Sequence, residues 1–398
     1  MNRWKLTFAV IWSGEALSLL SSSMVQFALV WWLTKETGSV SVLAIASIAA
    51  MLPQVLLAPF IGVWVDRFNR KAIMIISDLT IALFSLIVAI LYHFGMIEVW
   101  HIYIALAIRS IGSGFYMPAM QASVPLIAPE EQLTRVSAVN QVLQSISMMA
   151  GPALGAILIS ISSMEVAMSI DVICAVIASI TLLLVKIPNP VREYADTNVI
   201  QEMKDGLKAI LSNKPLSILM LTYVLCVFSF MPAGVLAPLV TFDYFKGGAA
   251  EMSIVEVAFG IGMIAGAAVL GVIGENKRKV LTICAAYIIF GLMMLITGLL
   301  PATGFIIFVG LALIMGVTMP MISTPITVIL QTNIEPDMLG RVFTLYTNLS
   351  LAPSILALVV TTFIGDALGI MLLFVISGVL CTAIGVVALM VPSLRRLG

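Results

Sequence analysis

The sequence predicts an all-α polytopic membrane protein with twelve transmembrane helices in two six-helix bundles. Composition is the first reason, because 61% of the 398 residues are hydrophobic and only 10% are charged. A soluble domain of this composition would expose large apolar patches. The spacing of the apolar runs and the placement of the basic residues are the second and third reasons.

The apolar runs are long and continuous, which is typical of membrane helices and not of the alternating strands of a barrel. A helix needs about 20 predominantly apolar residues to cross a bilayer. Twelve runs of this kind are present, at residues 8–33, 41–63, 72–94, 100–124, 137–161, 165–187, 215–240, 252–274, 279–299, 303–329, 341–364 and 367–391.

The basic residues predict the orientation of these helices. If the amino terminus is inside the cell, all 20 Lys and Arg residues except Lys35, Lys246 and Arg109 fall on the cytoplasmic side. By the positive-inside rule, both termini are therefore cytoplasmic in a multi-pass protein of the cell membrane. This alternation requires an even number of helices. The first run is too long for the core of a signal peptide, so we expect it to be the first helix.

One long polar stretch divides the chain into a bundle at 1–187, a cytoplasmic linker at 188–214 and a bundle at 215–398. Residues 199–211 of the linker have amphipathic helical spacing, which fits a helix on the membrane surface or a simple tether. The two halves also resemble each other: Met117-Pro118, for example, has a counterpart in Met319-Pro320. A duplicated set of six helices places a substrate site near the midplane, between the repeats.

A short charged loop between the second and third runs carries the strongest motif. It has the form Gly-x-x-x-Asp-Arg-x-x-Arg-Lys, with Gly62, Asp66, Arg67, Arg70 and Lys71. This loop resembles the signature between helices 2 and 3 of the major facilitator superfamily. The resemblance implies that Asp66 faces the amino-terminal end of helix 11, near Arg341, and favours the outward-open state. An anion is stabilised at such a helix end.

A second motif lies in the fifth run, where Gly151-Pro152 is followed by Gly155. Gly-Pro-x-x-Gly resembles the antiporter motif that the superfamily's exporters carry and its uptake symporters generally lack. Glycines permit close contact between helices, and proline bends a helix. The glycine-rich eighth run could be the partner in this contact.

Ionisable residues inside the runs are rare and costly to insert, so each is a candidate for function. Glu15, Asp78, Arg109 and Asp171 lie in the first half, whereas the second half has only Glu256. We therefore expect the first bundle to handle protons. A resemblance to the superfamily's helix 4 motif, Arg-x-x-Gly-x-Gly, implies that Arg109 couples proton movement to transport.

The individual roles of these ionisable residues stay open at the level of sequence. Glu15 begins a polar stripe along one helix face, and it could carry a proton or form a structural hydrogen bond. Asp171 and Glu15 are both candidate partners for Arg109, since an arginine stays protonated and needs a carboxylate. Asp78 could join the charged loop or carry a proton.

Residues at suitable depth for substrate contact are polar, aromatic or flexible, a mixture that suits bulky amphiphilic molecules. They are Gln26, Tyr116, Met117, Asn140, Gln144, Tyr223, Phe228 and Asn348. Stretches such as 9–14, 109–112 and 169–172 are similar to the macrolide-efflux branch of bacterial exporters. That resemblance implies proton-driven efflux of hydrophobic drugs by alternating access.

Other functions remain as alternatives: an exporter of a siderophore, lipid or peptide, an uptake symporter that the Gly-Pro motif disfavours, and a transport-inactive sensor. The sequence contains no Gly-x-x-x-x-Gly-Lys-Ser/Thr loop for ATP and no enzymatic motif. Its four cysteines have no paired spacing, so neither a disulfide nor a metal site is expected. The expected partners are a small hydrophobic substrate, protons and the lipid bilayer. We expect a monomer without cofactor and without affinity for nucleic acid.

Overall fold

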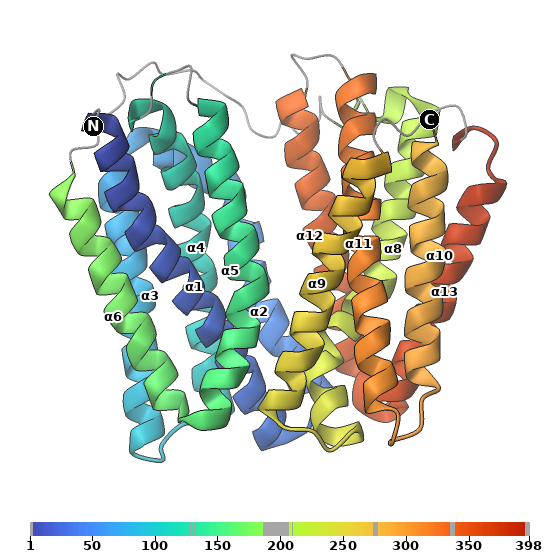
Figure 1. Ribbon diagram of the computed structural model, residues 1–398, viewed down its shortest axis with the longest axis horizontal. Helices are drawn as coiled ribbons and strands as arrows, with labels where there is room; N and C mark the ends of the chain where they lie inside the picture. Colours follow the sequence, from blue (N-terminus) through green and yellow to red (C-terminus); the bar gives the residue numbers. More distant parts are fainter. Residues whose placement is uncertain are drawn as a thin grey trace. The chain divides into compact units, whose positions relative to one another are not determined.

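The computed structural model describes residues 3–127, 129, 133–185, 207–208, 210–273, 278–334 and 339–394. These residues contain twelve long α-helices (Figure 1). Ten of them are long and apolar enough to cross a membrane, and the other two, α4 and α5, have 29 residues each. The prediction of an all-helical membrane protein with twelve long helices is therefore confirmed.

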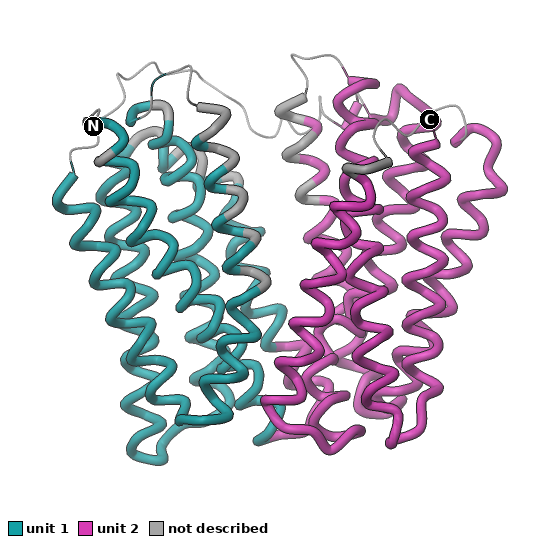
Figure 2. Tube along the Cα trace, in the orientation of Figure 1, with its two compact units in different colours: residues 1–36, 46–195 teal, residues 37–45, 196–398 magenta. Residues whose placement is uncertain are grey.

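The chain forms two compact units (Figure 2). The first consists of Met1–Glu36 and Ala46–Ala195. Within it, α3 packs against both α4 and α6. The helices in this half of the chain are α1 (Arg3–Thr37), α2 (Val40–Arg67), α3 (Arg70–His93), α4 (Val99–Ile127), α5 (Leu133–Ile161) and α6 (Met164–Leu184).

The second unit consists of Thr37–Ile45 and Asp196–Gly398. Two of its helix pairs, α9 with α11 and α10 with α13, pack closely. A Cβ atom at Gly262 of α9 would overlap the carbonyl oxygen of Leu313 in α11, so only glycine permits this approach. The helices are α8 (Lys214–Leu239), extended by a π-helical turn η2 (Val240–Tyr244), α9 (Ala249–Ile273), α10 (Lys279–Gly298), α11 (Phe305–Asn333), α12 (Leu339–Leu368) and α13 (Ile370–Met390).

The end of α12 has two features that position its neighbours. Gly369 alone separates α12 from α13, and its φ of +79° lies in the region that favours glycine. Asp366, three residues earlier, accepts a hydrogen bond from the backbone N–H of Val40, at 2.8 Å. Since Val40 begins α2, a carboxylate from another helix caps this amino terminus.

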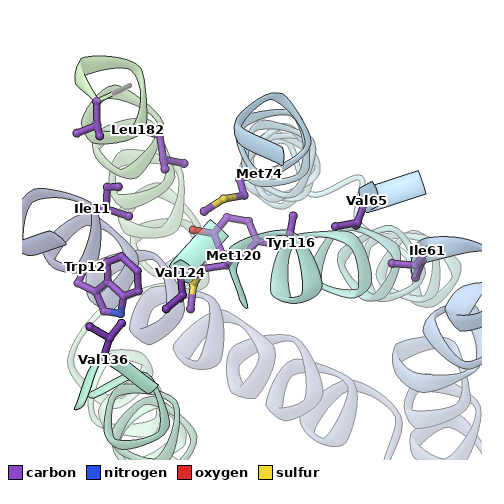
Figure 3. Packing of buried hydrophobic residues seen from close by; sticks show 12 residues of the cluster. Ile11, Trp12, Ile61, Val65, Met74, Tyr116, Met120, Val124, Val136 and Leu182 are labelled. Carbon is purple, nitrogen blue, oxygen red and sulfur yellow. The ribbon is translucent and has the colours of Figure 1, made fainter. Parts of the chain in front are cut away.

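An apolar cluster fills one end of the first unit, and all six of its helices contribute (Figure 3). Trp12 and Tyr116 are its largest side chains, and both are almost fully buried. The cluster therefore fixes the two helices, α1 and α4, that carry Glu15 and Arg109. Most of the predicted linker 188–214, including most of its amphipathic segment, lies outside the described residues.

Candidate proton-coupling site

The polar stripe of α1 faces the other helices of the first unit. Glu15 is only 2% exposed, and Ser18 and Ser21 are also buried. Successive polar residues of the stripe contact different helices: Glu15 reaches α4, Ser18 reaches α3, and Ser22 reaches α6. Through this stripe, α1 connects α3, α4 and α6 in one buried polar network.

Arg109 and Asp171 form a buried ion pair between α4 and α6. The Nη1 atom of Arg109 lies 2.8 Å from Oδ2 of Asp171, and both side chains are almost fully buried. The other guanidinium nitrogen, Nη2, donates to the backbone carbonyl of Ser22 at 3.0 Å. Of the two candidate partners that the sequence left open for Arg109, the structure brings Asp171 to it.

Three serines complete the hydrogen bonding of Asp171. Ser21 and Ser22 of α1 donate to its Oδ1 at 3.0 and 3.1 Å, and Ser85 of α3 donates to its Oδ2 at 2.7 Å. Together with Arg109, four donors surround this carboxylate, which stabilises its ionised form. Sequence reasoning missed Ser21 and Ser85. A signal existed for Ser85, because it follows Asp78 by two helical turns and shares its face.

Glu15 and Asp78 are less well satisfied than Asp171. The hydroxyl of Tyr116 donates to Oε2 of Glu15, and Ser18 donates to Oδ1 of Asp78 at 3.0 Å. Their second oxygens, Oε1 of Glu15 and Oδ2 of Asp78, are buried, and no hydrogen-bond partner is found for either among the described residues. The described hydrogen bond of Asp78 is with Ser18 of α1, whereas the side chains of Asp66 and Arg67 in the charged loop, its other expected neighbours, lie outside the described part of the structure.

The difference between these carboxyl groups has a chemical consequence. A buried carboxylate oxygen without a partner carries a large desolvation penalty, and protonation removes the charge that causes it. Protonation would bring no such gain at Asp171, because a guanidinium and three hydroxyls already compensate its charge. The site can therefore hold a proton on Glu15 or Asp78 while Asp171 stays ionised.

The Gly-Pro-x-x-Gly motif brings α5 against α1. A Cβ atom at Gly151 would overlap the Cβ of Ser23, and one at Gly155 would lie 2.7 Å from the carbonyl oxygen of Met24. Within the first unit these two glycines therefore contact α1, and the possible contact with the glycine-rich eighth run, which belongs to the second unit, stays a prediction. Trp12 of α1 also donates to the Asn140 side chain of α5, so the two helices are joined at a second level.

The charged loop is described only in part. Arg70 donates to the carbonyl of Ala122 at 2.6 Å, and Lys71 donates to the carbonyls of Leu183 and Val185. These lysine bonds satisfy carbonyls at the end of α6, a common role for a cation. The surroundings of Gly62, Asp66, Arg67 and Arg341 lie outside the described part of the structure.

The eight substrate candidates do not share one environment. Tyr116 and Asn140 are occupied by Glu15 and Trp12. The ring of Tyr223 packs against that of Tyr346, with centroids 5.0 Å apart and an interplanar angle of 33°, and its hydroxyl lies 2.6 Å from that of Ser350. The remaining candidates with described side chains, namely Gln26, Met117, Gln144 and Phe228, are half-buried, and the side chain of Asn348 is not described. Tyr346, the neighbour of Tyr223, was not among the substrate candidates.

Comparison with known proteins gives consistent matches over the chain. Residues 11–352 match the family model of the Major Facilitator Superfamily. Macrolide efflux protein A of Streptococcus pyogenes is 40% identical over 398 residues, which is 100% of this chain and 98% of that protein. The protein of the same name from Enterococcus faecalis is 42% identical over 77% of this chain and 96% of its own length.

Solved structures agree on the fold. A bacterial homologue of the iron transporter ferroportin, crystallised in an inward-facing state, has a TM-score of 0.77. The match covers 96% of this chain and 98% of the other at 14% sequence identity. At that identity the likeness concerns the fold alone.

Proposed function

The chain belongs to the Major Facilitator Superfamily, and on that premise we propose that it exports macrolide-like or other hydrophobic drugs in exchange for protons. The family is one of multi-pass membrane transporters and not of enzymes. Support for the cargo comes from the full-length similarity to proteins named for macrolide efflux. Support for proton exchange comes from the buried network of the first unit.

The observation that carries the proton part is the contrast among three buried carboxyl groups. Glu15 and Asp78 each keep one unpartnered oxygen among the described residues, whereas Asp171 is paired with Arg109. Glu15 and Asp78 are therefore the proposed proton carriers. Asp171 is proposed to remain ionised and to hold the guanidinium, which cannot itself release a proton in a protein.

In the proposed cycle, drug enters from the cytoplasm or the inner leaflet and leaves on the outer side. Proton uptake by a carboxyl of the first unit then resets the transporter by alternating access. Protonation changes the balance between conformations only if one of them binds the proton more tightly. The cytoplasmic position proposed for both termini follows from the distribution of basic residues.

The test is drug-induced proton movement in proteoliposomes, with erythromycin and ethidium as substrates. We expect movement in the wild type, a strong loss in Glu15→Gln and Asp78→Asn, and drug binding retained in both variants. Ser169→Ala, which removes an exposed hydroxyl bonded to its own helix, is the matched control and should behave as the wild type. Wild-type protein that binds drug and moves no protons would refute the exchange. Binding of neither compound would refute the drug assignment.

A further inference from the structure

The contact between α1 and α5 in the first unit occurs beside the charged network. Gly151 touches Ser23, and Gly155 approaches the backbone of Met24. Ser21 and Ser22, which precede Ser23 and Met24 on α1, donate hydrogen bonds to Asp171. One glycine contact and the hydrogen bonds of the network therefore lie within a single helical turn of α1.

The backbone of α1 is itself a ligand of Arg109. The carbonyl of Ser22 accepts from Nη2 at 3.0 Å, while the hydroxyl of the same residue donates to Asp171 at 3.1 Å. Ser22 thus contacts both members of the ion pair. The same helix carries Glu15, which is almost fully buried and has an oxygen without a described partner. A shift of α1 along its axis would change all of these distances together.

We propose that Gly151 and Gly155 are positioning residues for proton coupling, because they fix the axial position of α1 relative to the buried ion pair. This inference rests on the proposed function and deepens it. The motif then does more than bend α5. It sets the position at which the hydroxyls of Ser21 and Ser22 donate to Asp171 and the carbonyl of Ser22 accepts from Arg109. It also sets the depth at which Glu15 exchanges its proton.

The geometry of the contact explains why only glycine serves. The atoms that a side chain at Gly155 would meet belong to the backbone of Met24, with the carbonyl oxygen at 2.7 Å and Cα at 3.1 Å. Backbone cannot rotate away as a side chain can, so α1 or α5 has to move. The serine hydrogen bonds to Asp171 are 3.0 and 3.1 Å long. A displacement of about half an ångström would break them, since interactions beyond about 3.5 Å no longer count as hydrogen bonds.

The charged and titratable groups around this part of α1 come from four helices. They are Glu15 on α1 itself, Asp78 on α3, Arg109 and Tyr116 on α4, and Asp171 and Cys174 on α6, of which Cys174 lies beside Ser21 and Asp171. A displaced α1 would change the surroundings of each of them. The pH dependence of transport is therefore the readout that separates a positioning role from a general loss of packing.

Each alanine variant can be compared with a variant or control chosen from the atoms that the new Cβ would meet. In Gly151→Ala the new Cβ would meet the Cβ of Ser23, so Ser23→Gly removes the obstacle and the double variant should recover. In Gly155→Ala the obstacle is backbone, so no recovery with Ser23→Gly is expected. Gly262→Ala in the second unit creates a comparable overlap with the backbone of Leu313, far along the chain from the network, and serves as control.

The experiment measures protons moved per drug transported, and its pH profile, in proteoliposomes with equal amounts of folded protein. We expect at least about a fivefold lower ratio and a shifted profile for Gly151→Ala, since overpacking of this kind costs enough to change an equilibrium by that factor. Ser23→Gly should restore both quantities, whereas Gly262→Ala should reduce the amount of folded protein and leave the ratio unchanged.

Three outcomes count against the proposal, and they can be told apart. A wild-type ratio and profile in Gly151→Ala, alongside normal coupling in the wild type, refutes the positioning role alone. Absence of proton movement in the wild type refutes the proposed function together with this inference. A double variant that folds and stays as uncoupled as Gly151→Ala also counts against the contact with Ser23.

Discussion

The buried ion pair of Arg109 and Asp171 sets the surroundings of the other described polar residues in the first unit. Removing one partner of such a pair is far more harmful than removing both, because the remaining charge is left uncompensated. Arg109 has Asp171 as its described ion-pair partner, and the serines contribute only neutral donors. In the proposed function, Asp171 therefore keeps its charge, whereas Glu15 and Asp78 exchange protons.

This assignment predicts a large stability effect at Asp171. Asp171→Asn should destabilise the folded protein by about 3–5 kcal/mol, the range for breaking a buried pair. Glu15→Gln should cost much less, since it removes a charge for which the described residues provide no cationic partner. Thermal unfolding of the purified variants in detergent measures both. Equal melting temperatures for the two variants would contradict the assignment.

Sequence reasoning found the charged residues of the network but not their pairing. Arg109, Asp171, Glu15 and Asp78 stand out because ionisable residues are rare in membrane helices. Depth in the membrane left two partners open for Arg109, and only the packing of α4 against its neighbours selects one. Serines such as Ser21 are not identified from the sequence, because inserting a hydroxyl into a membrane costs little free energy at any position of a helix.

The helices themselves were predictable for a simple reason. In a membrane every backbone polar group has to be satisfied within its own helix, so apolar length alone defines each element. The run at 279–299, for example, corresponds to α10, which spans Lys279–Gly298. Which helices touch was not predictable in the same way. Gly151 indicates that some helix approaches closely, but nothing in its sequence surroundings selects α1 over α9.

The carboxylate cap of α2 is expected to stabilise the folded protein. Besides Val40, Asp366 accepts hydrogen bonds from the Ser39 hydroxyl at 3.2 Å and the Ser41 backbone N–H at 3.4 Å. Loss of a helix cap typically costs about 0.5–2 kcal/mol. Asp366→Ala should therefore lower the melting temperature of the purified protein, and Asp366→Asn, which keeps an acceptor, should lower it less.

Asp243 supplies the control for this cap. Its carboxylate forms an exposed ion pair with Lys246, at 3.1 Å, and exposed pairs contribute little to stability. Asp243→Ala should leave the melting temperature almost unchanged. If the two alanine variants melted alike, the cap at α2 would have no measurable role in stability.

At the scale of the whole molecule, the two units contribute differently to the proposed cycle. The described ion pair that is buried belongs to the first unit, whereas Lys246 and Asp243 of the second unit are exposed. The second unit instead contains the aromatic pair Tyr223 and Tyr346, whose rings are in tilted contact. Coupling therefore requires that protonation in one half changes the conformation available to the other, as alternating access demands.

Proton-coupled export can be measured directly as erythromycin uptake by inside-out membrane vesicles that contain the protein. An imposed pH gradient, acid inside and without ATP, should drive labelled erythromycin into the vesicles against its concentration gradient. Collapse of the gradient by nigericin should stop the uptake, and so should Glu15→Gln. Uptake that persists at full rate after the gradient has been collapsed, or no uptake at all by folded protein, would contradict proton-coupled export.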